Sequence, residues 1–216
     1  MRSAVMALVL TWMMALPAAA APDSGKSVEA ATSYLVMLDA SAAMALPFGA
    51  TTRLEAATRV LNEVLSQSTR PGQIELLTYG YSEQSQCKDF LMDTPIRADR
   101  MDLLDAQLKC VVPRAKLPLD MLIEQQVKRL EAAKAIGRIV VVSGGLEKHR
   151  TSVCIDAEGG VEHPTQVEVL VVDEREEAEI PTALGCLAKR YGGQTRLVKT
   201  ESELARAILE SVRVDG

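Results

Sequence analysis

The sequence predicts an α/β fold in which a doubly wound, mostly parallel central sheet is flanked by helices. Apolar segments rich in Val, Ile and Leu recur along the chain, and near-continuous apolar runs are typical of strands buried on both faces. Segments with a helical spacing of apolar residues separate them, which favours parallel pairing through crossovers. With 216 residues and 48% hydrophobic content, the chain is long enough for one well-buried domain.

Each strand is indicated by a short apolar run between turn residues. The run Ile-Val-Val-Val, for example, lies between Gly137 and the pair Gly144-Gly145. On this basis we expect strands at 34–39, 74–79, 138–143, 167–172 and 195–198, with a short edge strand at 90–92.

Helices are expected between these strands, at 53–68, 99–109, 118–135, 176–191 and 201–212. Thr51 and Thr52 are candidate caps for the first helix, and Pro71-Gly72 would stop it. Pro118 suits a first helical turn. The acidic run 173–177 favours a helix start, because carboxylates complement the N-terminal dipole.

The N-terminus has the pattern of a secretory signal peptide. Arg2 precedes an apolar run from Ala4 to Leu16, and small residues follow Pro17. A run of roughly 13 residues is too short to span a hydrocarbon core of about 30 Å comfortably. We therefore expect a signal peptide at 1–20, a flexible leader at 21–32, one domain at 33–213 and no membrane span after signal removal. An uncleaved anchor is the alternative.

Four cysteines follow the expected signal, and an even number in an exported chain favours two disulfides. Sequence proximity favours Cys87–Cys110 and Cys154–Cys186, although three pairings are possible. Each bond would close a loop of roughly 20–30 residues and contribute on the order of 3–4 kcal/mol. A Cys₄ metal site is the alternative, but the close C-x-x-C spacing typical of such sites is absent.

Charge and composition argue against a nucleic-acid partner. The net charge is −5 and only 3% of the residues are aromatic, so the chain lacks both a basic surface and a stacking platform. The signal and the cysteines together favour a periplasmic protein, with full secretion as the alternative.

The first apolar strand ends in Asp39-Ala40-Ser41, where a ligand-facing loop of a parallel sheet is expected. This loop and several later segments together resemble a von Willebrand factor A-type domain of exported bacterial proteins. The matching segments, in family order, are 39–44, 53–57, 79–80, 87–89, 113–119, 142–145 and 186–193.

The resemblance implies a metal-ion-dependent adhesion site, for which the family uses five side chains. This chain keeps Asp39 and Ser41 and departs at Ala43, Leu117 and Gly144. Mg²⁺ prefers near-octahedral oxygen coordination, and the three departing side chains offer no oxygen. We therefore expect a degenerate site and no cofactor. The alternative is that Mg²⁺ or Mn²⁺ binds at Asp39 and Ser41, with further oxygens from Asp120, Ser143 or Glu147.

The expected function is a non-catalytic protein-interaction module with an envelope or extracellular protein partner. The resemblance implies that binding uses the loops at the carboxyl edge of the sheet. The candidate binding residues are Asp39, Ser41, Met44, Phe48, Leu117, Ser143 and Gly144. Of these, Met44, Phe48 and Leu117, together with Leu46, are expected to form an exposed apolar patch.

A small envelope hydrolase is a remote alternative. Ser143 and His149 are six residues apart in the chain, a spacing that carries no geometric information by itself. The strained G-x-S-x-G turn of the α/β-hydrolases is absent, and His149 and His163 are expected to face solvent in loops.

Overall fold

The structure is a computed structural model. It describes residues 33–68, 73–83, 95–100, 111–113, 119–135, 137–145 and 163–212, together with positions 102, 103, 106 and 109. The expected signal peptide, the leader and the expected edge strand at 90–92 lie outside these residues.

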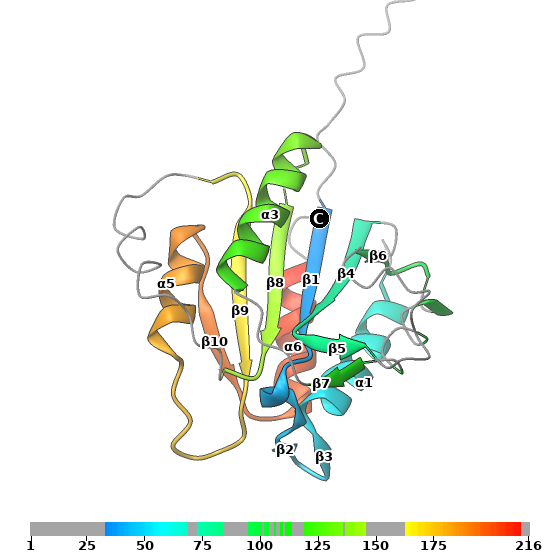
Figure 1. Cartoon of the computed structure of the whole chain (residues 1–216), viewed down its shortest axis with the longest axis vertical. Coiled ribbons are helices and arrows are strands. Elements are labelled where there is room, and N and C mark those ends of the chain that lie inside the picture. Colours follow the sequence, from blue (N-terminus) through cyan, green and yellow to red (C-terminus); the bar gives the residue numbers. More distant parts are fainter. Residues whose placement is uncertain are drawn as a thin grey trace, which may run out of the picture.

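A six-stranded sheet forms the centre of the molecule, with the strand order β10-β9-β8-β1-β4-β6 (Figure 1). All neighbouring strands pair in parallel except β6, which is antiparallel to β4. The strands are β1 (Ser33–Asp39), β4 (Ile74–Tyr79), β6 (Ile96–Arg97), β8 (Gly137–Ser143), β9 (Gln166–Val172) and β10 (Thr195–Val198). The fold class expected from the sequence is therefore confirmed.

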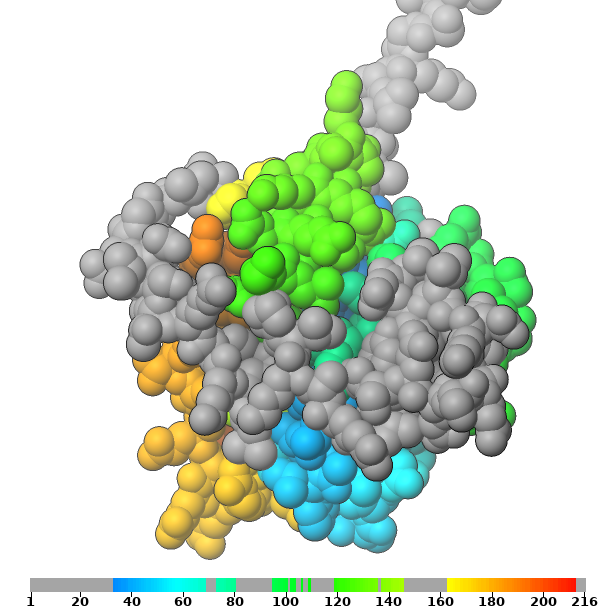
Figure 2. Space-filling model, viewed as in Figure 1, coloured from blue at the N-terminus to red at the C-terminus, as the bar shows by residue number. Residues whose placement is uncertain are grey.

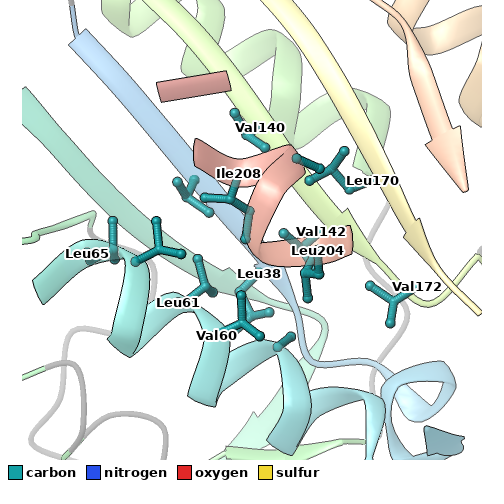
Figure 3. Close-up of a cluster of buried hydrophobic side chains, with 14 of the residues drawn as sticks. Leu38, Val60, Leu61, Leu65, Val140, Val142, Leu170, Val172, Leu204 and Ile208 are labelled. Atoms are coloured by element: carbon teal, nitrogen blue, oxygen red, sulfur yellow. The ribbon is translucent and has the colours of Figure 1, made fainter. Parts of the chain in front are cut away.

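In the part of the chain that the structure describes, α1 (Arg53–Ser66), α3 (Leu119–Ala132), α5 (Thr182–Arg190) and α6 (Glu201–Val212) cover the sheet, two on each face. Buried residues of α1 and α6 pack on one face, and those of α3 and α5 pack on the other. Alternate residues of one strand point to opposite faces, so Leu38 lies in the α1–α6 core and Met37 in the α3–α5 core. Figure 3 shows the first core, where Leu61 of α1 and Leu204 of α6 approach the strands.

Shorter elements lie at the carboxyl edge of the sheet. A 3-10 turn, η1 (Ala42–Ala45), leads into an antiparallel hairpin of β2 (Pro47–Phe48) and β3 (Thr51–Thr52). A second antiparallel pair joins β5 (Tyr81–Glu83) and β7 (Val111–Pro113).

The start of α1 is fixed by its sequence. Thr52 is the N-cap, and its side chain accepts a hydrogen bond from the backbone N–H of Glu55. The Glu55 carboxylate accepts in return from the Thr52 N–H, which completes a capping box. The expectation of a threonine cap is confirmed, and it fixes where residue 53 enters the carboxyl edge.

The helix expected at 176–191 is wrong at its start, because α5 begins at Thr182. Residues 173–181 form a loop instead. Asp173 is buried and accepts hydrogen bonds from the backbone and side chain of Arg175, so it does not cap a helix. Position 181 is a proline, which suits the start of a helix better than its interior.

Candidate functional site

Polar residues from four elements converge at the carboxyl edge of the sheet. Asp39 ends β1, Ser143 ends β8, Asp173 directly follows β9, and Arg53 opens α1. Because the parallel strands end at one edge, residues more than 100 positions apart in the chain meet there. We call Asp39, Ser41, Arg53, Ser143, Gly144 and Asp173 the edge cluster.

Asp39 is fully buried and accepts several hydrogen bonds. Its Oδ1 accepts from the backbone N–H of Ser41 at 2.7 Å, and its Oδ2 accepts from the N–H of Gly144 at 3.0 Å. The hydroxyl of Ser143 lies 3.5 Å from the same Oδ2 and itself accepts from the N–H of Gly145 at 3.1 Å. Burial raises the pKa of Asp39, and the hydrogen bonds oppose that rise.

Gly80, which follows β4, allows the Asp39 loop to approach the neighbouring strand. Its φ is +77°, and a Cβ there would lie 3.1 Å from both Oδ1 of Asp39 and the backbone nitrogen of Ser41. A side chain would thus meet both an unfavourable backbone conformation and the site itself.

Ala43 and Gly144, two of the positions that depart from the family pattern, lie against each other. A Cβ on Gly144 would stand 2.6 Å from the Cβ of Ala43 and 2.9 Å from its carbonyl carbon. Neither residue offers a side-chain oxygen, and the Gly144 N–H already donates to Oδ2 of Asp39. These residues do not fit the oxygen shell that Mg²⁺ requires.

Other ligands that the sequence suggested do not complete a metal site within the described residues. These residues contain no group of three or more His, Cys, Asp or Glu side chains that could hold a metal ion. Asp120 is the second residue of α3. Glu147 and Leu117 lie outside the described residues.

Arg53 is a member of the edge cluster that our sequence interpretation missed as a site residue. Its side chain is buried, its Nη1 donates to the carbonyl oxygen of Gly144 at 2.7 Å, and its Nη2 lies 2.8 Å from Oδ1 of Asp173. The hydrogen bond from Arg175 is the main cause of the lowered pKa of Asp173, and Arg53 contributes. The sequence could have indicated this role. Arg53 was expected in the first turn of a helix, where a cation is unfavourable next to the helix dipole unless an acceptor compensates it.

The apolar patch expected from the sequence is wrong for two of its members. Met44 and Phe48 are 0% and 2% exposed and belong to the α1–α6 core. Leu46 is half-buried. Asp39, Ser41, Ser143 and Gly144 are brought together as expected, but they too are buried.

Two other segments supply the accessible surface at this edge. The end of η1 and the hairpin expose Ala45, Pro47, Gly49 and Ala50, and the loop after β9 exposes Glu174 to Glu177, Glu179 and Ile180. The Gly49 N–H donates to a carboxylate oxygen of Glu174 at 2.5 Å, which joins the two segments. They lie at the same end of the molecule in Figure 2, in blue and gold. We call the exposed parts of 45–50 and 174–180 the edge surface.

Histidine and cysteine residues lie away from this edge or outside the described residues. His163 is only partly exposed, and its ring contacts that of Tyr191 in a tilted arrangement with centroids 4.8 Å apart, so it is not a free loop residue. His149 lies outside the described residues, and the hydrolase alternative is therefore untested. Cys186, on α5, is disulfide-bonded. Cys87, Cys110 and Cys154 lie outside the described residues, so the pairing stays a prediction.

Comparison with solved structures supports the fold. The chain is similar to a von Willebrand factor type A protein from Catenulispora acidiphila, with 14% identity and a TM-score of 0.59 over 84% of this chain and 42% of that one. It is also similar to a mutant of the PilB minor pilin from Streptococcus sanguinis, with 11% identity and a TM-score of 0.56 over 88% and 62%. A third similar structure is the pilus adhesin SpaC from Lactobacillus rhamnosus GG. It has 8% identity and a TM-score of 0.54 over 86% of this chain and 30% of that one.

These likenesses show a von Willebrand factor A-like fold, and the chain spans less than two thirds of the length of each of these neighbours. No family model and no curated protein matches the sequence. Among the described residues, no helix combines the length and apolar character needed to cross a membrane.

Proposed function

We propose that this chain is an exported, non-catalytic protein-interaction module that binds a protein partner through the edge surface without a metal ion. The surroundings of Asp39 carry the proposal, because Oδ2 of Asp39 accepts the Gly144 N–H and neither Ala43 nor Gly144 offers a side-chain oxygen to an ion. The fold supports an interaction role, as does the likeness to a minor pilin and a pilus adhesin.

The edge surface replaces the buried candidate residues as the proposed contact. Its hairpin side presents small uncharged residues and its loop side presents four glutamates. In this proposal Asp39, Ser41 and Ser143 support the surface from below and do not touch the partner. Periplasmic location, or else secretion, and a Cys154–Cys186 bond belong to the same proposal.

The test is capture from a native envelope extract by oxidised protein lacking residues 1–20, in Mg²⁺ and in EDTA. Two variants change the edge surface, Ala50→Glu on the hairpin and Glu177→Arg on the loop. Glu63→Arg is the matched control, because Glu63 is exposed near the far end of α1. We expect one partner to be captured equally in both buffers, to be lost in both edge variants and to be retained by the control.

Two results would contradict the proposal. Capture that needs Mg²⁺ and disappears in Asp39→Ala would favour the alternative, a metal-dependent adhesion module that uses Asp39 and Ser41. Capture that both edge variants retain would mean that the partner binds elsewhere on the chain.

A further inference from the structure

Among the described residues, Arg53 is a buried cation at the carboxyl edge. Its side chain is 2% exposed, although it occupies the first position of α1, where unpaired N–H groups disfavour positive charge. A buried arginine at such a position requires compensation from nearby acceptors. The edge cluster provides these acceptors on two different strand ends.

One contact holds the end of β8. Arg53 Nη1 donates to the Gly144 carbonyl oxygen at 2.7 Å, while the Gly144 N–H donates to Asp39. Both backbone polar groups of Gly144 are thus engaged, one by a carboxylate and one by a guanidinium. The resemblance implies a metal-binding carboxylate at the Gly144 position, whereas here Gly144 holds Asp39 through its backbone N–H.

A second contact holds the loop after β9. Asp173 pairs with Arg53 at 2.8 Å and also binds the guanidinium of Arg175 with both carboxylate oxygens. The next residue, Glu174, accepts the Gly49 N–H from the hairpin. A continuous series of contacts therefore runs from Arg53 to both segments of the edge surface.

We propose that Arg53 is a positioning residue that takes the place of the metal as the fixed cation of this edge. A divalent ion would draw loops together through side-chain oxygens. Here the guanidinium, with donors in a planar fork, connects Gly144 of one strand end to Asp173 of another. In this arrangement a side chain of the protein itself orders the carboxyl edge, so no added ion is needed. That this order serves partner binding rests on the proposed function.

Backbone amide exchange, measured by NMR on the free protein, tests this role. The reporters are the N–H groups of Gly49 and Gly144, and the core amide of Val141 is the reference. In Arg53→Met we expect both reporters to exchange at least about tenfold faster while Val141 is unchanged. Arg53→Lys keeps the charge but lacks the fork, so we expect it to restore protection only in part.

Arg59→Met is the matched control. Arg59 lies on the same helix and pairs with Glu201, but both side chains are exposed. In Arg59→Met we expect the Gly49 and Gly144 amides to exchange at the wild-type rate. Should Arg53→Met fail to fold, the double variant R53M/D173L replaces the buried pair by apolar residues, a change that proteins often tolerate. Its Gly49 and Gly144 amides should still lose protection.

The role is overturned if the reporters in Arg53→Met or in R53M/D173L keep wild-type protection. It is also overturned if Mg²⁺ slows the reporters in the wild-type protein, because a metal ion would then order the edge. These measurements need no partner. They can confirm the role of Arg53 even if partner capture fails, and the reverse also holds.

Discussion

Replacing Gly144 by alanine tests how closely the end of β8 packs against Ala43 of η1. The new Cβ would stand 2.6 Å from the Cβ of Ala43 and 2.9 Å from its carbonyl carbon. The second atom belongs to the backbone, so either η1 or the end of β8 must shift. Overpacking of this kind costs about 1–3 kcal/mol.

A shift would also disturb the hydrogen bond from the Gly144 N–H to Asp39, which is fully buried. Leaving that carboxylate short of a donor adds about 1–3 kcal/mol. The sum is about 2–6 kcal/mol, and for a domain of this size it lowers the thermal midpoint by roughly 4–24 °C. Thermal unfolding followed by circular dichroism under oxidising conditions measures it.

Gly185→Ala is the matched control, because no heavy atom lies within 4 Å of a Cβ there and the residue is inside α5. We expect Gly185→Ala to raise the free energy of unfolding by about 0.5–1 kcal/mol, because alanine favours a helix interior more than glycine does. In a double-mutant cycle, Ala43→Gly should recover part of the loss in Gly144→Ala, since it removes the 2.6 Å contact but not the 2.9 Å one. Wild-type stability of Gly144→Ala, or a loss that Ala43→Gly leaves unchanged, would refute the reasoning.

Three further predictions concern the cap, the metal and the pH dependence. Thr52→Ala removes the N-cap acceptor of α1 and should cost about 1 kcal/mol in thermal unfolding, while Thr52→Ser should cost less; equal losses would contradict the capping role. Neither millimolar Mg²⁺ nor EDTA should move the thermal midpoint of the wild-type protein; stabilisation by Mg²⁺ that depends on Asp39 would show that an ion binds. Burial raises the pKa of Asp39, so the folded state binds the carboxyl proton more tightly than the unfolded chain does. The contribution of Asp39 to stability therefore falls as the pH rises from the ordinary carboxyl pKa to the raised value. Asp39→Asn should remove this part of the slope in denaturant unfolding measured across that range, and an unchanged slope would refute it.

Much of the sheet could be predicted from the sequence because its strands are buried on both faces. β4, β10 and α6 have the expected bounds, and β1, β8 and β9 each begin one residue earlier than expected. Runs such as residues 139–142 favour a buried strand, because they are short, rich in β-branched residues and flanked by glycines. The convergence of Asp39, Ser41, Ser143 and Gly144 followed from the rule that parallel strands end at one edge.

Burial within the loops could not be predicted in the same way. Met44 and Phe48 lie in a turn and a hairpin, where no periodicity separates inward from outward positions, and both point into the core. The acidic run 173–177 has the composition of a helix start, but Asp173 is drawn to Arg53 by a contact across 120 positions of sequence. Such long-range ion pairs leave no local pattern.

The sheet topology determines where this domain can be joined to other polypeptide. β1 begins at the amino edge of the sheet, and α6 returns to that same edge, where the Ser211 hydroxyl donates to Glu168 near the start of β9 (Figure 1). Both ends of the domain therefore leave from the side opposite the edge surface. A domain with this geometry can be inserted between other modules, or attached to a support at either end, with the same face still directed outward.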